Sequence, residues 1–395
     1  MKRIKVIRVI ARLNIGGPAI HTIILNEGLD KNRFDSHLIT GKPAQGEGDM
    51  TDLAREKGIK LTIIPELSRK INLWPDMIAL WKLFKIIKKE KPDIVHTHTA
   101  KAGVLGRSAA ILNRVPITVH SFHGHVFHSY FSSTATKVFI FIERIFAKFT
   151  DRLIVVSDSI KRDILKHLGT ASETKTSVLR LGLNLEKFKN TNQLKGEFRK
   201  ELNIDTAVLL VGIIGRLTAV KNHKLLFEAI RFLKDESPDL NVRFLIIGDG
   251  ELRSSLESCA ANLGIREWVQ FVGWRKDIPR VYADLDIVAL TSLNEGTPLS
   301  IIEAMAAHKA VVATAVGGVP DLVEDKKNGW LVDSNDAAKL KQALSILLKD
   351  EKLRNKIGQT AGLHVYERYS KEQLIENVEN LYKDLVTKKN LEKIK

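Results

Sequence analysis

The chain has 395 residues, of which 44% are hydrophobic and 27% are charged. These are the proportions of a soluble globular protein, and at roughly 150 residues per domain the length predicts two or three domains. The net charge of +16 attracts anionic partners, namely nucleic acid, acidic lipid or a phosphorylated substrate. Because the basic residues are scattered, with neither zinc-finger spacing nor alternating aromatic and basic residues, the charge does not favour nucleic acid.

The start of the chain is basic and then apolar, but Arg8 and Arg12 interrupt the apolar run and no small-residue cleavage site follows. We therefore expect residues 4–11 to form a first β-strand and not a signal peptide. No apolar stretch approaches the roughly 18 residues that span a bilayer. The single cysteine, Cys259, excludes an internal disulfide framework and fits a reducing compartment. These features predict a cytoplasmic protein that meets a membrane, if at all, at its surface.

Short β-branched runs alternate with longer amphipathic segments along the whole chain. The first half offers strands, in chain order, at residues 4–11, 37–40, 60–65, 93–98, 117–122, 152–157 and 177–181. The second half offers strands at residues 207–215, 242–248, 269–273, 286–292 and 310–316. Strands interleaved with helices predict parallel sheets built from βαβ units, so the two series predict two doubly wound α/β domains.

A polar, weakly periodic segment separates the two series and predicts a linker near residues 184–200. We expect a Rossmann-like domain at residues 1–184, a second one at 185–370 and a final helix at 371–395. Two facing domains leave a central cleft. In open α/β sheets ligands bind beyond the carboxyl ends of the strands, so the residues that follow each strand are the candidate site residues.

Two of these loops carry residues suited to a phosphate. Gly16 and Gly17 follow the first strand, where they allow the backbone to approach a ligand or simply form a tight connection. Gly215 ends the first strand of the second series, and Arg216 and Lys221 follow on its loop. Two fixed cations suit a diphosphate, because each charge-assisted hydrogen bond contributes about 1.5–3 kcal/mol. The alternative is a pair of solvated surface charges.

A third loop combines two glutamates with the start of a helix. Glu295 follows a buried strand, and Pro298 occupies a favoured first position of a helix that contains Glu303. This helix directs its partially positive end toward the same cleft as Arg216 and Lys221. A turn separates the two glutamates, so we expect each to hold a different part of one ligand, such as hydroxyls of a ribose or hexose. Taken singly, Glu303 is also explained as a helix N-terminal carboxylate and Glu295 as a surface residue.

The stretch NEGTPLSIIEAMA, followed by GGVPDLV, resembles the two-glutamate donor motif of the family 4 retaining glycosyltransferases. The likeness covers almost the whole chain in order, through NIGGPAIH, DIVHTHTAKAG, SFHGHVF, GRLTAVKN, GDG, FVGWRKDI and YERYSKEQLIENVENLY. The resemblance implies the GT-B fold of two facing Rossmann-like domains. It also implies that the N-terminal domain binds the acceptor, that the C-terminal domain binds the nucleotide sugar, and that residues 371–395 pack back on the N-terminal domain.

The same resemblance implies a role for each matching residue. Arg216 and Lys221 bind the donor diphosphate, Glu303 holds the ribose and Glu295 lies against the transferred sugar, most commonly that of a UDP-sugar. His123 serves in sugar positioning or acceptor contact and joins Arg216, Lys221 and Glu295 in the catalytic set. Further donor-binding positions are Gly16, Gly17, Gly215, Trp274, Arg275 (by its backbone), Gly296, Thr297, Pro298 and Leu299. We assign His96, His98, Lys101 and His125 to the acceptor side.

The implied reaction retains the configuration of the sugar. The acceptor hydroxyl attacks on the face that the diphosphate leaves, and a phosphate oxygen accepts the proton. The protein then chiefly stabilises charge that grows on the leaving group.

A metal site deserves separate consideration because histidines cluster in the first half, at positions 96, 98, 120, 123, 125 and 128. Zinc is one use for such a cluster, but no carboxylate or cysteine completes a ligand set, so we interpret these histidines as polar site residues. Asp284 and Asp286 resemble a metal-binding signature of the other glycosyltransferase fold but precede a strand, and we interpret this likeness as chance. We predict neither a metal nor another cofactor.

Residues 126–149 combine an apolar run with Lys137, Arg144 and Lys148 on one helical stripe. Such a helix either lies in an anionic membrane interface or belongs to the domain core. With the net positive charge, the first alternative favours a lipid-linked acceptor, such as a polyprenyl diphosphate sugar used for surface polysaccharide, at the inner face of the cytoplasmic membrane.

Two other function classes stay open at this point. A sugar-nucleotide epimerase shares the fold but lacks the paired glutamates in this context. A non-catalytic scaffold that binds sugar nucleotides differs from a transferase only in turnover.

Overall fold

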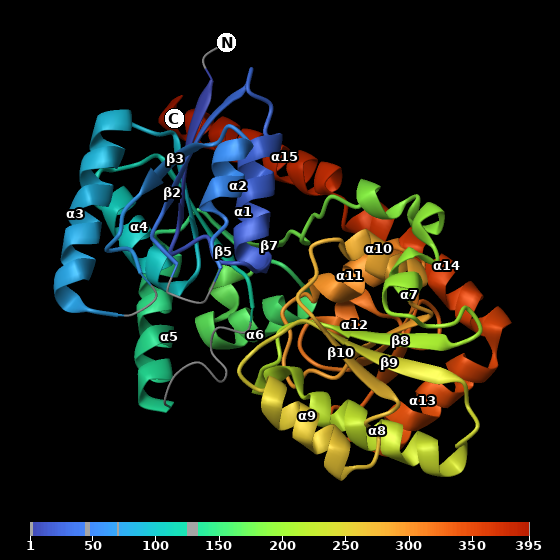
Figure 1. Cartoon of the computed structure of the whole chain (residues 1–395). Helices are drawn as coiled ribbons and strands as arrows, with labels where there is room; N and C mark the ends of the chain where they lie inside the picture. Colours follow the sequence, from blue (N-terminus) through green and yellow to red (C-terminus); the bar gives the residue numbers. More distant parts are fainter. Residues whose placement is uncertain (1–2, 44–47, 69–70, 125–132, 395) are drawn as a thin grey trace. The chain divides into compact units, whose positions relative to one another are not determined.

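The computed structural model describes residues 3–43, 48–68, 71–124 and 133–394. The chain divides into two compact units, which we call unit 1 (Met1–Leu183 with Tyr369–Lys395) and unit 2 (Asn184–Arg368). Each unit contains one parallel sheet with helices packed on it (Figure 1). The prediction of two doubly wound α/β domains is therefore confirmed.

Unit 1 contains a seven-stranded sheet in the order β3-β2-β1-β4-β5-β6-β7. Its strands are β1 (Ile4–Ile10), β2 (Phe34–Thr40), β3 (Lys60–Ile63), β4 (Ile94–His98), β5 (Ile117–Phe122), β6 (Arg152–Val155) and β7 (Thr176–Val178). Its helices are α1 (Gly17–Gly28), α2 (Thr51–Glu56), α3 (Leu73–Glu90), α4 (Ala100–Leu112), α5 (Ser133–Lys148), α6 (Asp158–Leu168) and α15 (Lys371–Ile394). The chain moves toward one edge of the sheet from β1 and toward the other edge from β4, so the order reverses between these two strands.

Successive residues of β1 point to opposite faces of the sheet, and each face has its own core. Ile7 belongs to a buried cluster with α3 and α4, whereas Val6 belongs to a cluster with α1 and α15. From α15, Tyr382 accepts a hydrogen bond from the Arg8 guanidinium at 3.1 Å. The last helix of the chain is thus part of the core of unit 1.

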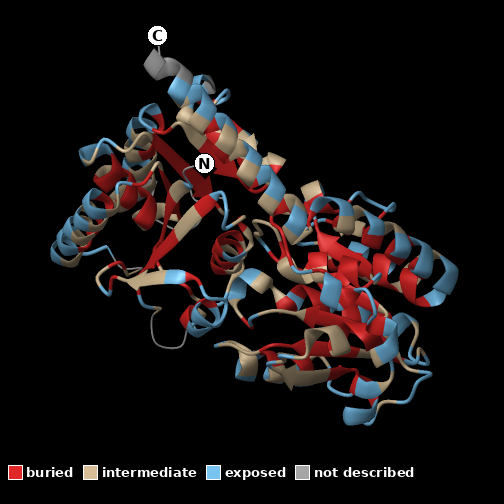
Figure 2. Cartoon of the chain, turned by 90° about the horizontal axis from the view of Figure 1, so that it is seen from above, coloured by how far each residue is buried: buried red, intermediate tan, exposed pale blue. Residues whose placement is uncertain are grey.

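Unit 2 contains a six-stranded sheet in the order β10-β9-β8-β11-β12-β13. Its strands are β8 (Leu209–Ile214), β9 (Val242–Ile247), β10 (Val269–Gly273), β11 (Ile287–Leu290), β12 (Ala310–Thr314) and β13 (Trp330–Val332). Its helices are α7 (Glu197–Glu201), α8 (His223–Glu236), α9 (Arg253–Asn262), α10 (Ile278–Asp284), α11 (Leu299–Ala306), α12 (Val319–Leu322), α13 (Ala337–Lys349) and α14 (Glu351–Arg368). The strand order reverses between β8 and β11. Buried residues run along the strands, and exposed residues lie on the outer faces of the helices (Figure 2).

The polar segment that the sequence predicts as a linker is ordered and packs on unit 2. It forms two short 3-10 turns and then α7, and both Phe188 and Phe198 are fully buried. Asp284 accepts hydrogen bonds from the backbone amides of Phe198 and Arg199, each at 2.9 Å, and Asp286 accepts one from the Arg199 guanidinium at 3.0 Å. These carboxylates therefore fasten the segment to the start of β11.

Within the part of the chain that the structure describes, no helix is both long enough and apolar enough to cross a bilayer.

Candidate active site

The candidate residues of unit 2 follow the two strands at which the strand order reverses. Gly215, Arg216 and Lys221 follow β8, and Glu295 follows the neighbouring strand β11. The crevice beyond such a reversal is where open α/β sheets bind ligands. The topology therefore brings these cations and this carboxylate to one edge of one sheet.

Lys221 and Glu295 are in direct contact. The Lys221 ammonium donates to Oε1 of Glu295 at 2.6 Å, and the Ser292 hydroxyl donates to the same oxygen at 2.6 Å. Two further hydrogen bonds join the loops. The Thr291 hydroxyl donates to the Lys221 carbonyl at 2.9 Å, and the Leu293 amide donates to the Val220 carbonyl at 2.8 Å. The Lys221 ammonium is thus held in position by Glu295.

Arg216 lies on the same loop and is much freer. Its side chain is 56% exposed, and its guanidinium lies 4.0 Å from the Glu251 carboxylate, beyond hydrogen-bonding distance. An exposed ion pair at this distance contributes little to folding. The guanidinium can therefore turn toward an anion at small cost.

The start of α11 adds donors beside Glu295. Pro298 is the residue just before the helix and Leu299 is its first residue, so the helix begins one residue later than the sequence predicts. Such a start leaves backbone amides without helical partners. The buried hydroxyl of Thr297 also lacks a hydrogen-bond partner within the described residues. These groups can take an anion or a sugar hydroxyl.

Glu303 lies inside α11 and is mostly buried. The Tyr282 hydroxyl lies 3.4 Å from one of its carboxylate oxygens, and the Lys187 ammonium lies 3.6 Å from the other. Burial raises the pKa of Glu303 above the usual range of a glutamate, while Lys187 and Tyr282 act in the opposite direction. A mostly buried carboxylate with long contacts retains capacity to accept hydrogen bonds from a ligand.

Two glycines behind this loop explain why GGVPDLV accompanies the glutamates. Gly317 has a φ of +54°, and a Cβ there would lie 1.8 Å from the Glu295 carbonyl oxygen. The next amide, that of Gly318, donates to the same oxygen at 3.0 Å. Only glycine permits this close backbone approach, so Gly317 positions Glu295. Our residue assignments did not include Gly317, although it is the first residue of the motif GGVPDLV.

Trp274 and Arg275 follow β10. The Trp274 side chain is 61% exposed and available for stacking. The Arg275 guanidinium binds Asp277 at 2.8 Å and Glu201 at 2.5 Å, and hydrogen bonds to these carboxylates raise its pKa. Its side chain is therefore fully engaged, which leaves the backbone for any ligand contact.

The candidate residues of unit 1 also follow the strands at which the order reverses, here β1 and β4. Gly16 and Gly17 stand at the start of α1, and a Cβ added to either would find its nearest neighbour at 3.9 Å. Packing therefore does not require glycine at these positions. The space instead suits a ligand that approaches the backbone.

The histidines of unit 1 differ in their surroundings. Both ring nitrogens of His96 are occupied, by the Tyr382 hydroxyl at 2.6 Å and the Ser121 hydroxyl at 2.7 Å. His98 and His123 face each other with their ring nitrogens 2.9 Å apart. Lys101 forms an ion pair with Asp76. His125, which we assigned to the acceptor side, and His128 lie outside the described residues.

His21, from α1, joins His98 and His123 in a group whose ring nitrogens lie within 4.8 Å of one another. Burial lowers the pKa of all three, that of His123 to about 4, so the rings are neutral near pH 7. Neutral imidazoles can bind sugar hydroxyls, and their spacing also suits a metal ion. Our sequence reasoning missed His21, although it closes the NIGGPAIH motif.

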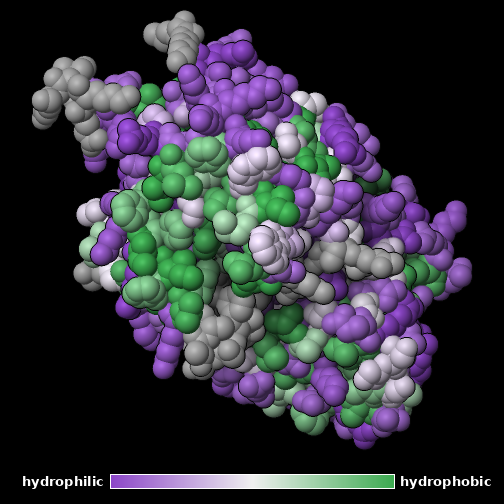
Figure 3. All heavy atoms as spheres, turned by 90° about the vertical axis from the view of Figure 1, so that its left-hand side faces the viewer, coloured by the Kyte–Doolittle hydropathy of each residue, from purple (hydrophilic) through white to green (hydrophobic). Residues whose placement is uncertain are grey.

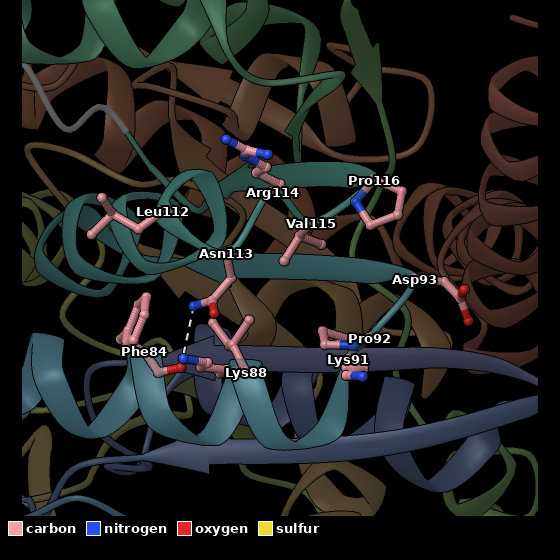
Figure 4. Close-up of a pocket in the computed structure, with 11 residues that line it drawn as sticks. Phe84, Lys88, Lys91, Pro92, Asp93, Leu112, Asn113, Arg114, Val115 and Pro116 are labelled. Atoms are coloured by element: carbon pink, nitrogen blue, oxygen red, sulfur yellow. Dashed lines mark hydrogen bonds between the residues drawn. The ribbon is translucent and has the colours of Figure 1, made fainter. Parts of the chain in front are cut away.

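A separate depression of about 470 Å³ lies between the ends of α3 and α4, with Phe84, Lys88, Asn113 and Arg114 in its lining (Figure 4). It lies where β4 and β5 begin. Ligands in this kind of sheet bind beyond the opposite ends of the strands, so we assign the depression no part in the reaction.

The chain matches two family models, Glycosyltransferase Family 4 over residues 15–187 and Glycosyl transferases group 1 over residues 195–364. Over 365 residues it is 32% identical to the UDP-Gal:alpha-D-GlcNAc-diphosphoundecaprenol alpha-1,3-galactosyltransferase of Escherichia coli, covering 92% of each chain. It is 28% identical to the capsular polysaccharide biosynthesis glycosyltransferase CapM of Staphylococcus aureus, over 90% of this chain and 91% of that one.

Among solved structures, the chain is similar to Anabaena Alr3699/HepE in complex with UDP-glucose. The TM-score is 0.81 at 22% identity, over 97% of this chain and 100% of that one. A likeness at this identity supports the fold, and it agrees with the predicted GT-B class. On the family matches and the Escherichia coli relative, the chain belongs to the family 4 glycosyltransferases.

Proposed function

We propose that this glycosyltransferase moves a sugar from a UDP-sugar to a hydroxyl of a saccharide carried on a polyprenyl diphosphate, with retention of configuration, in surface polysaccharide synthesis. The observation that carries the proposal is the Lys221–Glu295 contact beside the start of α11, with Arg216 on the same loop. The donor and the acceptor class are those named for the Escherichia coli relative.

The donor diphosphate fits the cationic end of this site. Arg216 and Lys221 bind its oxygens. The backbone amides of Gly296, Thr297 and Leu299 are further donors, whereas Pro298 between them has no N–H. Glu303 accepts hydrogen bonds from the ribose hydroxyls, and Trp274 stacks on the base. Glu295 accepts a hydrogen bond from the transferred sugar.

The reaction follows from this arrangement. The bond between the anomeric carbon and the diphosphate oxygen breaks as the acceptor hydroxyl forms a new bond to that carbon on the same face. The acceptor proton passes to the leaving phosphate oxygen, and UDP departs. Arg216, Lys221 and the start of α11 stabilise the growing negative charge. His123 is neutral over the physiological range and serves to orient the sugar or the acceptor.

No metal takes part in this proposal, because the cations named above supply the charge that the leaving group needs. The histidine group of unit 1 then binds hydroxyls.

The acceptor carries its saccharide on a lipid, so we also propose that the protein works at the inner face of the cytoplasmic membrane. The charge of +16 supports attraction to that anionic surface.

The family assignment favours glycosyl transfer over an epimerase or a non-catalytic scaffold. The decisive experiment measures calorimetric binding of UDP, GDP and ADP, and then transfer from several UDP-sugars to an undecaprenyl diphosphate GlcNAc acceptor. Selective binding of UDP and an α-linked product are expected. A free nucleotide sugar that changes configuration without transfer would support the epimerase, and binding without turnover would support the scaffold.

A further inference from the structure

We propose that α3 and α5 of unit 1 form one docking surface that lies on an anionic lipid bilayer. We call it the α3–α5 surface and define it by the exposed apolar and basic residues of the two helices and the residues just beside them. The inference rests on the proposed function, because it supplies the place at which a lipid-carried acceptor meets the enzyme.

The outward stripe of α3 is apolar over its first half. Ala79, Leu83 and Ile87 recur on the buried side and pack on the sheet. On the other side, Trp74 is 78% exposed and Trp81 is 55% exposed. Ile71, Leu73, Met77 and Ile78 are exposed with them. Two tryptophans seven residues apart on a solvent-facing stripe have no role in the core.

The α5 helix likewise has one buried side and one side with exposed apolar residues. Glu143 is fully buried and accepts two hydrogen bonds from the Arg107 guanidinium of α4, at 2.7 and 2.8 Å. Exposed apolar side chains lie on its outward side at Val138, Phe141 and Ile145, and exposed Phe149 follows its last residue. One side of α5 thus belongs to the core, as one of the two alternatives for residues 126–149 has it, and the other side faces solvent. Residues 126–132 of that segment lie outside the described residues.

Figure 3 shows a broad hydrophobic area on the side of unit 1 that carries α3. Soluble monomers rarely expose contiguous apolar patches of more than a few hundred Å², and larger ones mark a protein or membrane interface.

Charge selects the membrane as the occupant. All exposed charged residues in the described parts of α3 and α5 are basic, namely Lys85, Lys88, Lys89, Lys137, Arg144 and Lys148. The acidic residues of these helices are instead held by cationic or histidine partners, Asp76 by Lys101, Glu90 by His37 and Lys60, and Glu143 by Arg107.

Such a distribution differs from that of a subunit interface, whose buried core is depleted of lysine. Tryptophan beside lysine is typical of residues that lie at the level of lipid headgroups. The Lys85 ammonium lies 3.5 Å from the centre of the Trp81 ring, so one contact joins the apolar and cationic halves of the stripe.

The position of the surface suits the acceptor. Both α3 and α5 begin at the edge of the sheet where the strands end, because each helix follows a strand of a parallel sheet. The apolar half of α3 therefore lies at the same edge as Gly16, Gly17 and His123. A bilayer in contact with this surface presents a diphosphate-linked saccharide at the edge where unit 1 binds ligands.

The test measures cosedimentation of the full chain, without nucleotide sugar, with vesicles of phosphatidylcholine alone or mixed with phosphatidylglycerol. Wild type is expected to bind the mixed vesicles and to bind neutral ones far less. Leu73→Gln should weaken binding about tenfold or more, and Lys85→Gln about fivefold. Brominated lipid should quench the fluorescence of the exposed tryptophans.

Matched controls come from unit 2. Leu363 is 73% exposed against 75% for Leu73, and Lys352 is an exposed helical lysine like Lys85. Leu363→Gln and Lys352→Gln should bind vesicles as wild type does. Equal losses in the controls, or no vesicle binding by wild type, would overturn the proposal.

Sedimentation without lipid tests the other occupant. A dimer that Leu73→Gln dissociates would show that a second copy covers the surface, which also overturns the proposal. Transfer to a short, water-soluble acceptor separates this inference from the function. A chain that transfers sugar to this acceptor but ignores vesicles keeps the proposed function and loses the docking surface, whereas failed transfer with intact vesicle binding does the reverse.

Discussion

Replacement of Arg216 by alanine is expected to separate donor binding from folding. The side chain is 56% exposed, and its nearest carboxylate, that of Glu251, lies at 4.0 Å. Loss of such an exposed pair costs at most about 1 kcal/mol of stability. Loss of a charge-assisted contact with a diphosphate costs about 1.5–3 kcal/mol of binding. That range weakens UDP binding by roughly 10- to 150-fold.

Lys221→Ala is expected to act differently, because its ammonium already binds Glu295 at 2.6 Å. Its removal takes away a phosphate contact and also leaves the Glu295 carboxylate with a repulsive effect on the incoming diphosphate. We therefore expect weaker UDP binding than in Arg216→Ala, together with a larger loss of stability. Turnover should fall far more than stability in both variants.

Calorimetry of UDP binding, steady-state transfer and the thermal midpoint of unfolding would be measured for both variants and wild type. Glu257→Ala in α9 is a control that removes an ion pair with Arg253, outside the candidate site, and should leave UDP affinity unchanged. An unchanged UDP affinity in Arg216→Ala would refute the diphosphate role of this residue. If the activity and the thermal midpoint of a variant fell in parallel, the replaced residue would be needed for folding and not for the reaction.

Four further outcomes are expected. Glu295→Gln should bind UDP more tightly than wild type, because Lys221 is released, yet turn over more slowly; calorimetry and kinetics check this. Burial raises the pKa of Glu303, so the folded protein keeps the carboxyl proton of Glu303 to a higher pH than the unfolded chain does. The free energy of unfolding therefore falls as the pH rises from the ordinary glutamate pKa through the raised one. Denaturant unfolding of Glu303→Gln across that range should therefore show a stability advantage that appears only as the pH rises, alongside weaker UDP binding. Trp274→Ala should weaken UDP binding by about 1–3 kcal/mol in calorimetry with an unchanged thermal midpoint. Extensive treatment with a chelator should leave turnover unchanged, and a loss restored by zinc would instead assign a metal to the group around His123.

The sequence predicts the sheets well because their central strands, such as β4, β5, β11 and β12, are buried on both faces. All twelve strands that we predict are present, since runs such as residues 93–98 are β-branched and bounded by turns. The strand Trp330–Val332 escapes prediction because it has three residues, too few for a recognisable pattern. The supposed linker at residues 184–200 escapes for another reason. Its composition is polar, and only isolated apolar residues such as Phe188 and Phe198 attach it to the core. Their burial depends on tertiary contacts, which the local pattern does not show.

The candidate site shows the same limit. Arg216, Lys221 and Glu295 are found by their positions after strands, but the contact between Lys221 and Glu295 joins residues 74 positions apart. Spacing alone carries no information on such a contact. Adjacent strands create it, and the strand order is known only from the fold.

Periodicity also leaves the side of a helix undecided. Both sides of α3 are largely apolar, so the pattern gives two candidate stripes and does not say which one faces the sheet. Ala79, Leu83 and Ile87 pack inward, which leaves Trp74 and Trp81 in solvent. The exposed stripe therefore becomes visible only when the sheet is in place.

The contact between Lys221 and Glu295 bears on how this site favours the transition state over the bound donor. Glu295 orders the ammonium in advance, so little conformational freedom is lost when the diphosphate arrives. The same carboxylate competes for that ammonium while the donor is intact. As the bond to the sugar breaks, charge grows on the leaving phosphate and the ammonium is drawn toward it more strongly than before. An interaction that strengthens along the reaction lowers the barrier, whereas one already complete in the bound donor would only tighten binding. In the proposed reaction, the competition between Glu295 and the diphosphate for Lys221 would therefore contribute to catalysis.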